Sequence, residues 1–143
     1  MKKTVFIMSM IAIVAGCNSC KTKQKAAETQ QPATTAEMLV GKHWQLVELN
    51  GKAVETEAFI SFGKDFRFNG NLGCNLMNGT YELTGDTRIH FDQVVSTKKM
   101  CLNMTVEEEF AKVLEIADSY YVSDNELIFN RARMSPLAKF VKK

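Results

Sequence analysis

The chain has 143 residues, of which 45% are hydrophobic and 24% are charged. This length and balance are typical of one globular domain, and they exclude a disordered, fibrous or multidomain protein. With 18 basic and 16 acidic residues the chain is almost neutral, so we expect no charged surface that binds nucleic acid.

The N-terminus has the pattern of an export signal. Lys2 and Lys3 precede an apolar run over 5–14, which is too short to span a bilayer. Val14-Ala-Gly-Cys17 follows and resembles the lipobox of bacterial lipoproteins, in which the cysteine is lipidated and becomes the mature N-terminus. We therefore expect residues 1–17 to be a lipoprotein signal peptide and Cys17 to carry acyl chains such as palmitate. An ordinary secretory signal with an incidental cysteine is the alternative.

Residues 18–36 are expected to form a flexible tether ahead of the domain at 37–143. They are polar and lack apolar periodicity, so they cannot bury enough surface to offset the entropy of ordering. Cys20 lies in this segment. We expect it to be a free thiol, or to pair between molecules as an odd cysteine in an exported protein.

Alternating apolar and polar residues predict strands with one buried face in the first part of the domain. The expected strands cover 43–49, 58–62, 66–69, 79–84 and 88–92. Asn50-Gly51 predicts a hairpin after the first of them. The aromatic residues of these strands should mostly fill the core, with Val94 and Val95 packed beyond them; they are Phe59, Phe62, Phe66, Phe68, Tyr81 and Phe91.

One helix is expected, over residues 105–117. Its apolar residues recur at helical spacing and are Val106, Phe110, Val113, Leu114 and Ala117. Thr105 and Glu108 have the spacing of a capping box. The acids at 107–109 are expected on a solvated surface near the positive end of the helix dipole.

Three further strands, over 120–122, 126–129 and 137–141, follow the helix. Short strands at this spacing, with a single helix, predict an α+β fold. We expect a curved antiparallel sheet or partly closed barrel of about seven strands, with the helix packed on it.

The two cysteines of the domain lie in turns. Gly and Asn are concentrated in residues 70–75, between two strands, so the backbone should bend sharply around Cys74. Cys101 ends the polar run 96–101, and we infer that the two loops meet. In an exported protein such a pair favours a structural disulfide. A reduced buried pair and a redox-active pair are the alternatives, although redox thiols usually lie closer in sequence.

No residue pattern predicts catalysis, a metal site or another cofactor. His43 and His90 lack further ligands at suitable spacing, and no serine lies in a nucleophile elbow. Methionines around Cys101 offer soft ligands that would suit Cu(I), although methionine more often fills gaps in a core; they are Met77, Met100 and Met104. A curved sheet lined with aromatic residues would also suit a small apolar ligand.

Several separated motifs resemble those of the META/HslJ domain. They are Trp44-Gln-Leu, Asn69-Gly, Gly73-Cys-Asn75, Asn78-Gly-Thr-Tyr81, Ser96-Thr97, Met100-Cys101 and Glu109-Phe110. The resemblance covers residues 37–140, and its motif residues include Trp44, Gly73, Cys74, Asn75, Gly79, Tyr81, Thr97, Met100 and Cys101. It implies a small α+β domain of bacterial envelope lipoproteins, loosely linked to stress responses and motility. No established enzymatic activity comes with it.

The leading hypothesis is a non-enzymatic, monomeric, lipid-anchored domain of the cell envelope. It would bind the membrane through its N-terminal lipid and an envelope protein through its folded domain, or serve in an envelope stress response. In a cell with two membranes, Asn18 favours the outer one, because an aspartate there commonly retains lipoproteins at the inner membrane. The alternatives are a domain that binds small apolar ligands on the concave side of its sheet and, more distantly, a thiol redox protein.

Overall fold

A computed structural model describes residues 34–132 and 134–143. The expected signal peptide, Cys17, Cys20 and most of the expected tether lie outside the described residues. The elements, in chain order, are α1 (Thr35–Leu39), β1 (His43–Leu49), β2 (Lys52–Ala53), β3 (Phe59–Phe62), β4 (Arg67–Asn71), β5 (Leu76–Thr84), β6 (Arg88–Ser96), α2 (Thr105–Ile116), β7 (Ser119–Val122), β8 (Glu126–Asn130) and β9 (Ala138–Lys142).

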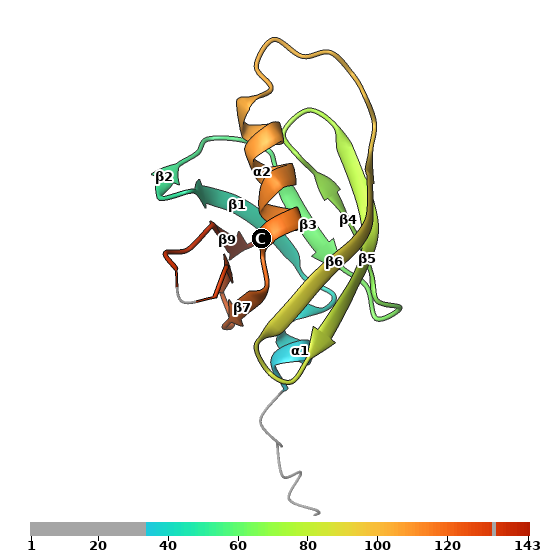
Figure 1. The fold of residues 1–143 in the computed structure, drawn as a ribbon, viewed down its shortest axis with the longest axis vertical. Coiled ribbons are helices and arrows are strands. Elements are labelled where there is room, and N and C mark those ends of the chain that lie inside the picture. Colours follow the sequence, from blue (N-terminus) through green and yellow to red (C-terminus); the bar gives the residue numbers. More distant parts are fainter. Residues whose placement is uncertain (1–33, 133) are drawn as a thin grey trace, which may run out of the picture.

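The described strands form one antiparallel sheet in the order β2-β1-β3-β4-β5-β6-β7-β8-β9. Because β1 also pairs with β9, eight strands close into a ring, and the short β2 remains outside it as an edge (Figure 1). The predicted antiparallel sheet is confirmed. The expected number of strands was too low, since the described part has nine strands and a second helix.

Aromatic side chains fill the inside of the ring. Phe62 lies between Tyr81 and Phe129, with ring centroids 5.0 and 6.4 Å apart, and Phe91 contacts Phe68 at 5.3 Å. These side chains are buried, as their alternation predicted. The concave side of the sheet is thus a packed core.

Three residues expected inside are exposed instead, namely Phe66, Val94 and Val95. The side chain of Phe66 is 59% exposed because this residue lies in the turn before β4 rather than in the strand. Val95 is 57% exposed because β6 extends to Ser96 and Val95 pairs with Asn78 on the outer side.

The five-residue helix α1 covers one end of the ring. Its N-cap is Thr34, which forms a capping box with Glu37. The Glu37 amide donates to the Thr34 hydroxyl at 3.3 Å, and the Thr34 amide donates to the Glu37 carboxylate at 3.0 Å. Leu39 is fully buried, and its carbonyl accepts a hydrogen bond from Trp44 Nε1 at 3.0 Å. Too short to show apolar periodicity, α1 includes the last residues of the expected tether.

The longer helix α2 begins at Thr105, and three of its residues, Phe110, Val113 and Leu114, are buried as predicted. The predicted capping box is wrong, because Thr105 is already helical and the N-cap is Met104, whose side chain makes no capping bond. Neither helix in residues 34–132 and 134–143 is long and apolar enough to cross a membrane.

The ring is weakest between β6 and β7, which share the single pair Arg88–Ser119. Asp118 reinforces this seam. Its carboxylate accepts a hydrogen bond from the Ala132 amide at 2.8 Å, and its Oδ2 atom lies 3.7 Å from Nη1 of Arg88. The backbone carbonyl of Asp118 accepts a hydrogen bond from the Ile89 amide. The Ala132 amide, the Ser119 hydroxyl and the neighbouring guanidinium groups lower the pKa of Asp118 below its usual value.

We predict that Asp118→Asn lowers stability at neutral pH and weakens its acid dependence. Because the folded-state pKa is lowered, the charged carboxylate stabilises the fold above pH 3.8, and this contribution is lost as the pH falls through the folded-state pKa. The measurement is the free energy of unfolding in urea at pH 7 and pH 3. The difference in this free energy between wild type and variant should be smaller at pH 3. Asp86→Asn, in the exposed β5–β6 turn, is the control. A difference that stays constant with pH would contradict the prediction.

Candidate functional site

The motif residues divide between the two ends of the fold. Most lie at the end remote from α1, where the bend (residues 72–75) meets the tip loop (residues 97–104, between β6 and α2) (Figure 1). Trp44 and Tyr81 lie in the core, and Gly79 lies at the bulge between β5 and β6.

A disulfide between Cys74 and Cys101 joins the bend to the tip loop, with the two Cα atoms 6.6 Å apart. The two loops therefore meet as predicted. With 27 residues of separation, the chain-entropy model gives a stabilisation of about 3.5 kcal/mol. Since the sulfur of Cys101 is bonded to Cys74 and Met77 lies in the core, the soft ligands considered for Cu(I) are not assembled.

Asn75 is the centre of the hydrogen-bond network beneath the disulfide, and it is only 1% exposed. Its side-chain oxygen accepts from the Thr97 hydroxyl and the Lys99 amide, each at 2.7 Å. Its side-chain nitrogen donates to Glu107 at 2.7 Å and to the Lys99 carbonyl at 3.1 Å. One carboxamide thus uses four hydrogen bonds to join the bend, the tip loop and α2.

Glu107, the hydrogen-bond partner of Asn75 on α2, does not lie where its charge predicted. We expected it on a solvated surface, but it is 8% exposed and also accepts the backbone amide of Asn75 at 2.9 Å. The expectation was wrong because α2 begins directly over the bend, where the bend supplies two donors. The helical spacing would have predicted this burial. Glu107 lies three and seven residues before the buried Phe110 and Leu114, which puts all three on one face of the helix.

Two glycines are required by the local backbone. Gly73 has φ +125°, a conformation that other residues rarely adopt, and its amide donates to Asn71 Oδ1 at 2.7 Å. At Gly79 a Cβ atom would lie 2.7 Å from the Phe68 ring and 2.9 Å from the Asp92 carbonyl. Both motif positions are therefore explained by folding.

Tyr81 is buried, and its hydroxyl donates to the Gly63 carbonyl at 2.8 Å, which anchors the turn between β3 and β4. Burial, with a smaller contribution from Asp65, raises the pKa of the Tyr81 phenol, so the group stays a neutral donor.

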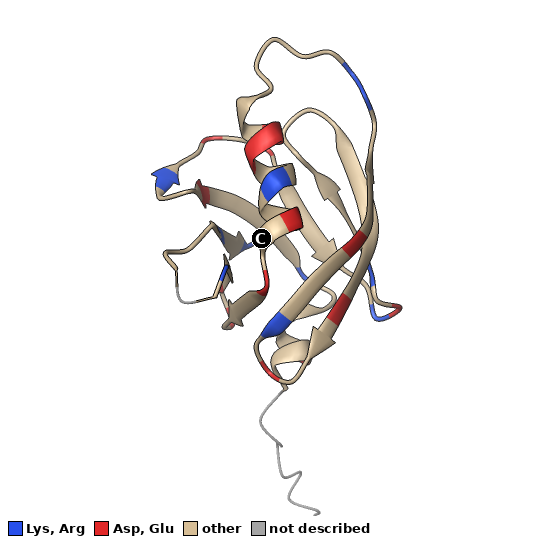
Figure 2. Ribbon diagram, viewed as in Figure 1, with Lys and Arg blue, Asp and Glu red and all other residues tan. Residues whose placement is uncertain are grey.

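The outer surface around the tip loop is apolar. Met100 and Leu102 are fully exposed, and Leu76 and Val95 are more than half exposed. The register of β5 against β6 places Leu76 and Val95 on the same outward side as neighbours along the diagonal. Lys98 and Lys99 are the charged residues of this loop, and Figure 2 shows basic residues and no acidic ones on it.

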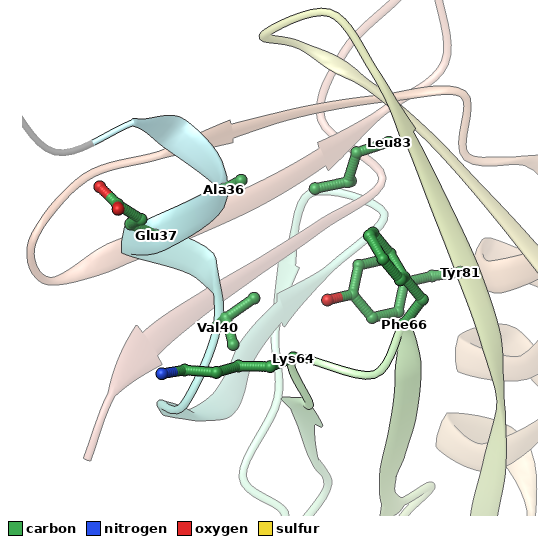
Figure 3. A pocket seen from close by; sticks show the side chains of 7 residues that line it. All are labelled: Ala36, Glu37, Val40, Lys64, Phe66, Tyr81 and Leu83. Atoms are coloured by element: carbon green, nitrogen blue, oxygen red, sulfur yellow. The ribbon is translucent and has the colours of Figure 1, made fainter.

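A groove lies at the opposite end, between α1, β5 and the β3–β4 turn. It has a volume of about 590 Å³ and is lined by Ala36, Glu37, Val40, Lys64, Phe66, Tyr81 and Leu83 (Figure 3). The sequence pattern does not predict this groove, because part of its wall comes from the short α1 and from a turn whose Phe66 fits the pattern of a strand.

Phe66 has an unusual backbone at the rim of this groove. Its φ is +59°, in the left-handed region that costs a non-glycine residue roughly 1–2 kcal/mol. The Gly63 amide donates to the Arg67 carbonyl and closes a hairpin loop of residues 64–66, in which the last position is usually glycine. Phe66 thus combines a solvent-exposed aromatic side chain with a backbone conformation that favours glycine.

The described residues contain no group of three or more His, Cys, Asp or Glu side chains placed to hold a metal ion. What the geometry offers is two surfaces, the apolar tip and the groove.

We predict that Asn75→Ala destabilises the fold by about 3 kcal/mol, because it removes the side-chain donor to the buried Glu107 carboxylate and both side-chain partners of the Lys99 backbone. Chemical unfolding would measure the loss. Asn78→Ala, at an exposed position of β5, is the matched control and should cost less than about 0.5 kcal/mol. Equal effects of the two variants would contradict a central role for Asn75.

Solved structures with the same fold are known. An NMR structure of a protein has 23% sequence identity and a TM-score of 0.59, covering 78% of this chain and 94% of that one. An NMR structure of a protein from Burkholderia xenovorans has 17% identity and a TM-score of 0.61, covering 85% and 97%. A crystal structure at 1.00 Å of a DUF4847 family protein from Bacteroides vulgatus has 18% identity and a TM-score of 0.55, covering 73% and 94%.

At these identities the similarity establishes the fold alone. No curated protein matches the sequence. The family model described as META domain matches residues 36–143, which include the bend, the tip loop and the groove. The chain therefore belongs to the META domain family.

Proposed function

We propose that this protein is a non-enzymatic, lipid-anchored domain of the cell envelope that presents its tip loop to a protein partner. The observation that supports this most directly is the placement of the two ends. Residue 34, from which the chain leads back to Cys17, adjoins α1, whereas the tip loop lies at the other end of the long axis (Figure 1). A domain anchored at one end would present its opposite end to a partner.

The tip has the properties of a preorganised binding surface. Its exposed apolar residues, Met100 and Leu102, flank the disulfide-bonded Cys101. Asn75 holds the backbone of the same loop through both polar groups of Lys99. A loop that is already ordered loses little entropy on binding, and exposed apolar groups supply the association energy.

The charge of the tip indicates the kind of partner. Lys98 and Lys99 are exposed next to Met100, so a complementary surface would combine an apolar pocket with acidic residues at its rim. We propose an envelope protein with such a surface. The lipid on Cys17 would hold the domain at the membrane, in the outer one where the cell has two.

We predict that the protein incorporates a palmitate analogue and that Cys17→Ser abolishes the incorporation. The reason is that Cys17 is the residue at the lipidation position of the lipobox motif. Metabolic labelling with an alkyne fatty acid, followed by membrane fractionation, is the measurement. Cys20→Ser is the matched control and should stay labelled and membrane-bound. Labelling of Cys17→Ser would rule out this anchor.

We predict that a photo-crosslinking residue at position 100 or 102 captures a discrete envelope protein in living cells. The same residue at Tyr121, which is exposed on β7 away from the tip, should not capture it. Met100→Ser with Leu102→Ser should weaken partner binding at least tenfold without changing the melting temperature, because both side chains are fully exposed in the fold. Equal capture from positions 100 and 121 would contradict the proposed surface.

A further inference from the structure

We infer that the groove beside α1 binds a single-chain amphiphile with an anionic head, of the class of alkyl carboxylates. This inference stands apart from the proposed protein partner, which would contact the opposite end of the fold. The groove volume of about 590 Å³ lies within the usual range of ligand pockets, about 300–1,000 Å³.

The wall of the groove suits an apolar chain. Ala36 comes from α1, Val40 is the C-cap residue that follows this helix, and Leu83 comes from the inward side of β5. In Figure 3 the side chains of Ala36 and Leu83 point toward one another across the groove, and the Tyr81 ring lies beside them. Tyr81 is only 2% exposed and its hydroxyl is bonded to the Gly63 carbonyl, so the phenol adds no free polar group to the wall.

The charges at the rim favour an anion. Lys64 forms no ion pair with any carboxylate in the described part of the chain. The carboxylate of Glu37 accepts the Thr34 amide in the capping box, and in Figure 3 it points away from Tyr81 and Leu83. Two nearby acids, Asp65 and Glu82, line a neighbouring hollow rather than this groove. A carboxylate head beside Lys64 would therefore meet an available cation.

Phe66 is a second, independent observation. Its backbone adopts a positive φ where glycine would be relaxed, yet its ring is 59% exposed and lies 5.9 Å from the ring of Tyr81. Strained residues of this kind cluster at ligand sites, and Phe66 is the positive-φ non-glycine residue that lines this groove. We assign Phe66 as the side chain that covers the bound apolar chain.

The test is a titration of the mature chain bearing Cys17→Ser with dodecanoate, below the concentration at which it forms micelles. The NMR signals of the Val40 and Leu83 methyl groups and of the Phe66 ring should shift and saturate together. Dodecyltrimethylammonium, which has the same chain and a cationic head, should bind at least tenfold more weakly. Shifts spread over the whole protein, or equal affinity for the two heads, would overturn the proposal.

Two variants test the roles of the residues. Phe66→Gly should weaken dodecanoate binding at least tenfold while leaving the melting temperature unchanged or higher, because glycine relieves the strained φ. Lys64→Glu should weaken binding by a similar factor and should not disturb the core, since Lys64 is exposed. The matched controls are Tyr121→Ser and Lys98→Glu, an exposed aromatic and an exposed lysine outside the groove. Wild-type affinity in both Phe66→Gly and Lys64→Glu would overturn the assignment.

Discussion

The buried carboxamide of Asn75 is the interaction on which the remote end of the fold depends. A polar group with 1% exposure is tolerated only when its donors and acceptors are used, and here the bend, the tip loop and α2 all contribute partners. The disulfide alone would join two points of the chain. Together with the network, it gives the tip loop a definite conformation although the loop has no regular secondary structure.

This arrangement explains why a motif can be prominent in the sequence without a catalytic role. Gly73, Cys74 and Asn75 provide, in turn, a permissive backbone, a covalent bond and a buried polar bridge. Trp44 and Tyr81 play comparable parts near the other end, where their polar atoms anchor α1 and the β3–β4 turn. Most of the family motif therefore describes how the ring is held at both ends, whereas the binding roles that we propose fall to the exposed Met100 and Phe66.

Local patterns predicted most of the strands, because alternation reports burial directly, and they predicted the meeting of Cys74 with Cys101. They left a curved sheet and a partly closed barrel as alternatives, since the pairing of β1 with β9 that closes the ring joins residues more than 85 positions apart. Phe66 was assigned to the core because its spacing from Phe68 fits a strand, whereas turn geometry decided its position. Glu107 was assigned to solvent by its charge, although its helical phase put it inside.

The single residue pair between β6 and β7 has a consequence for dynamics. Beyond Ile89, whose amide donates to the Asp118 carbonyl, β6 is paired with β5 alone, so separation of β6 from β7 would break few backbone hydrogen bonds. Within the eight-stranded ring, we therefore expect the strands to separate first along this line. Amide hydrogens of Ile89 and Tyr120 should thus exchange with solvent faster than those of β4 and β5. The other strand pairs of the ring should stay intact while β6 and β7 separate.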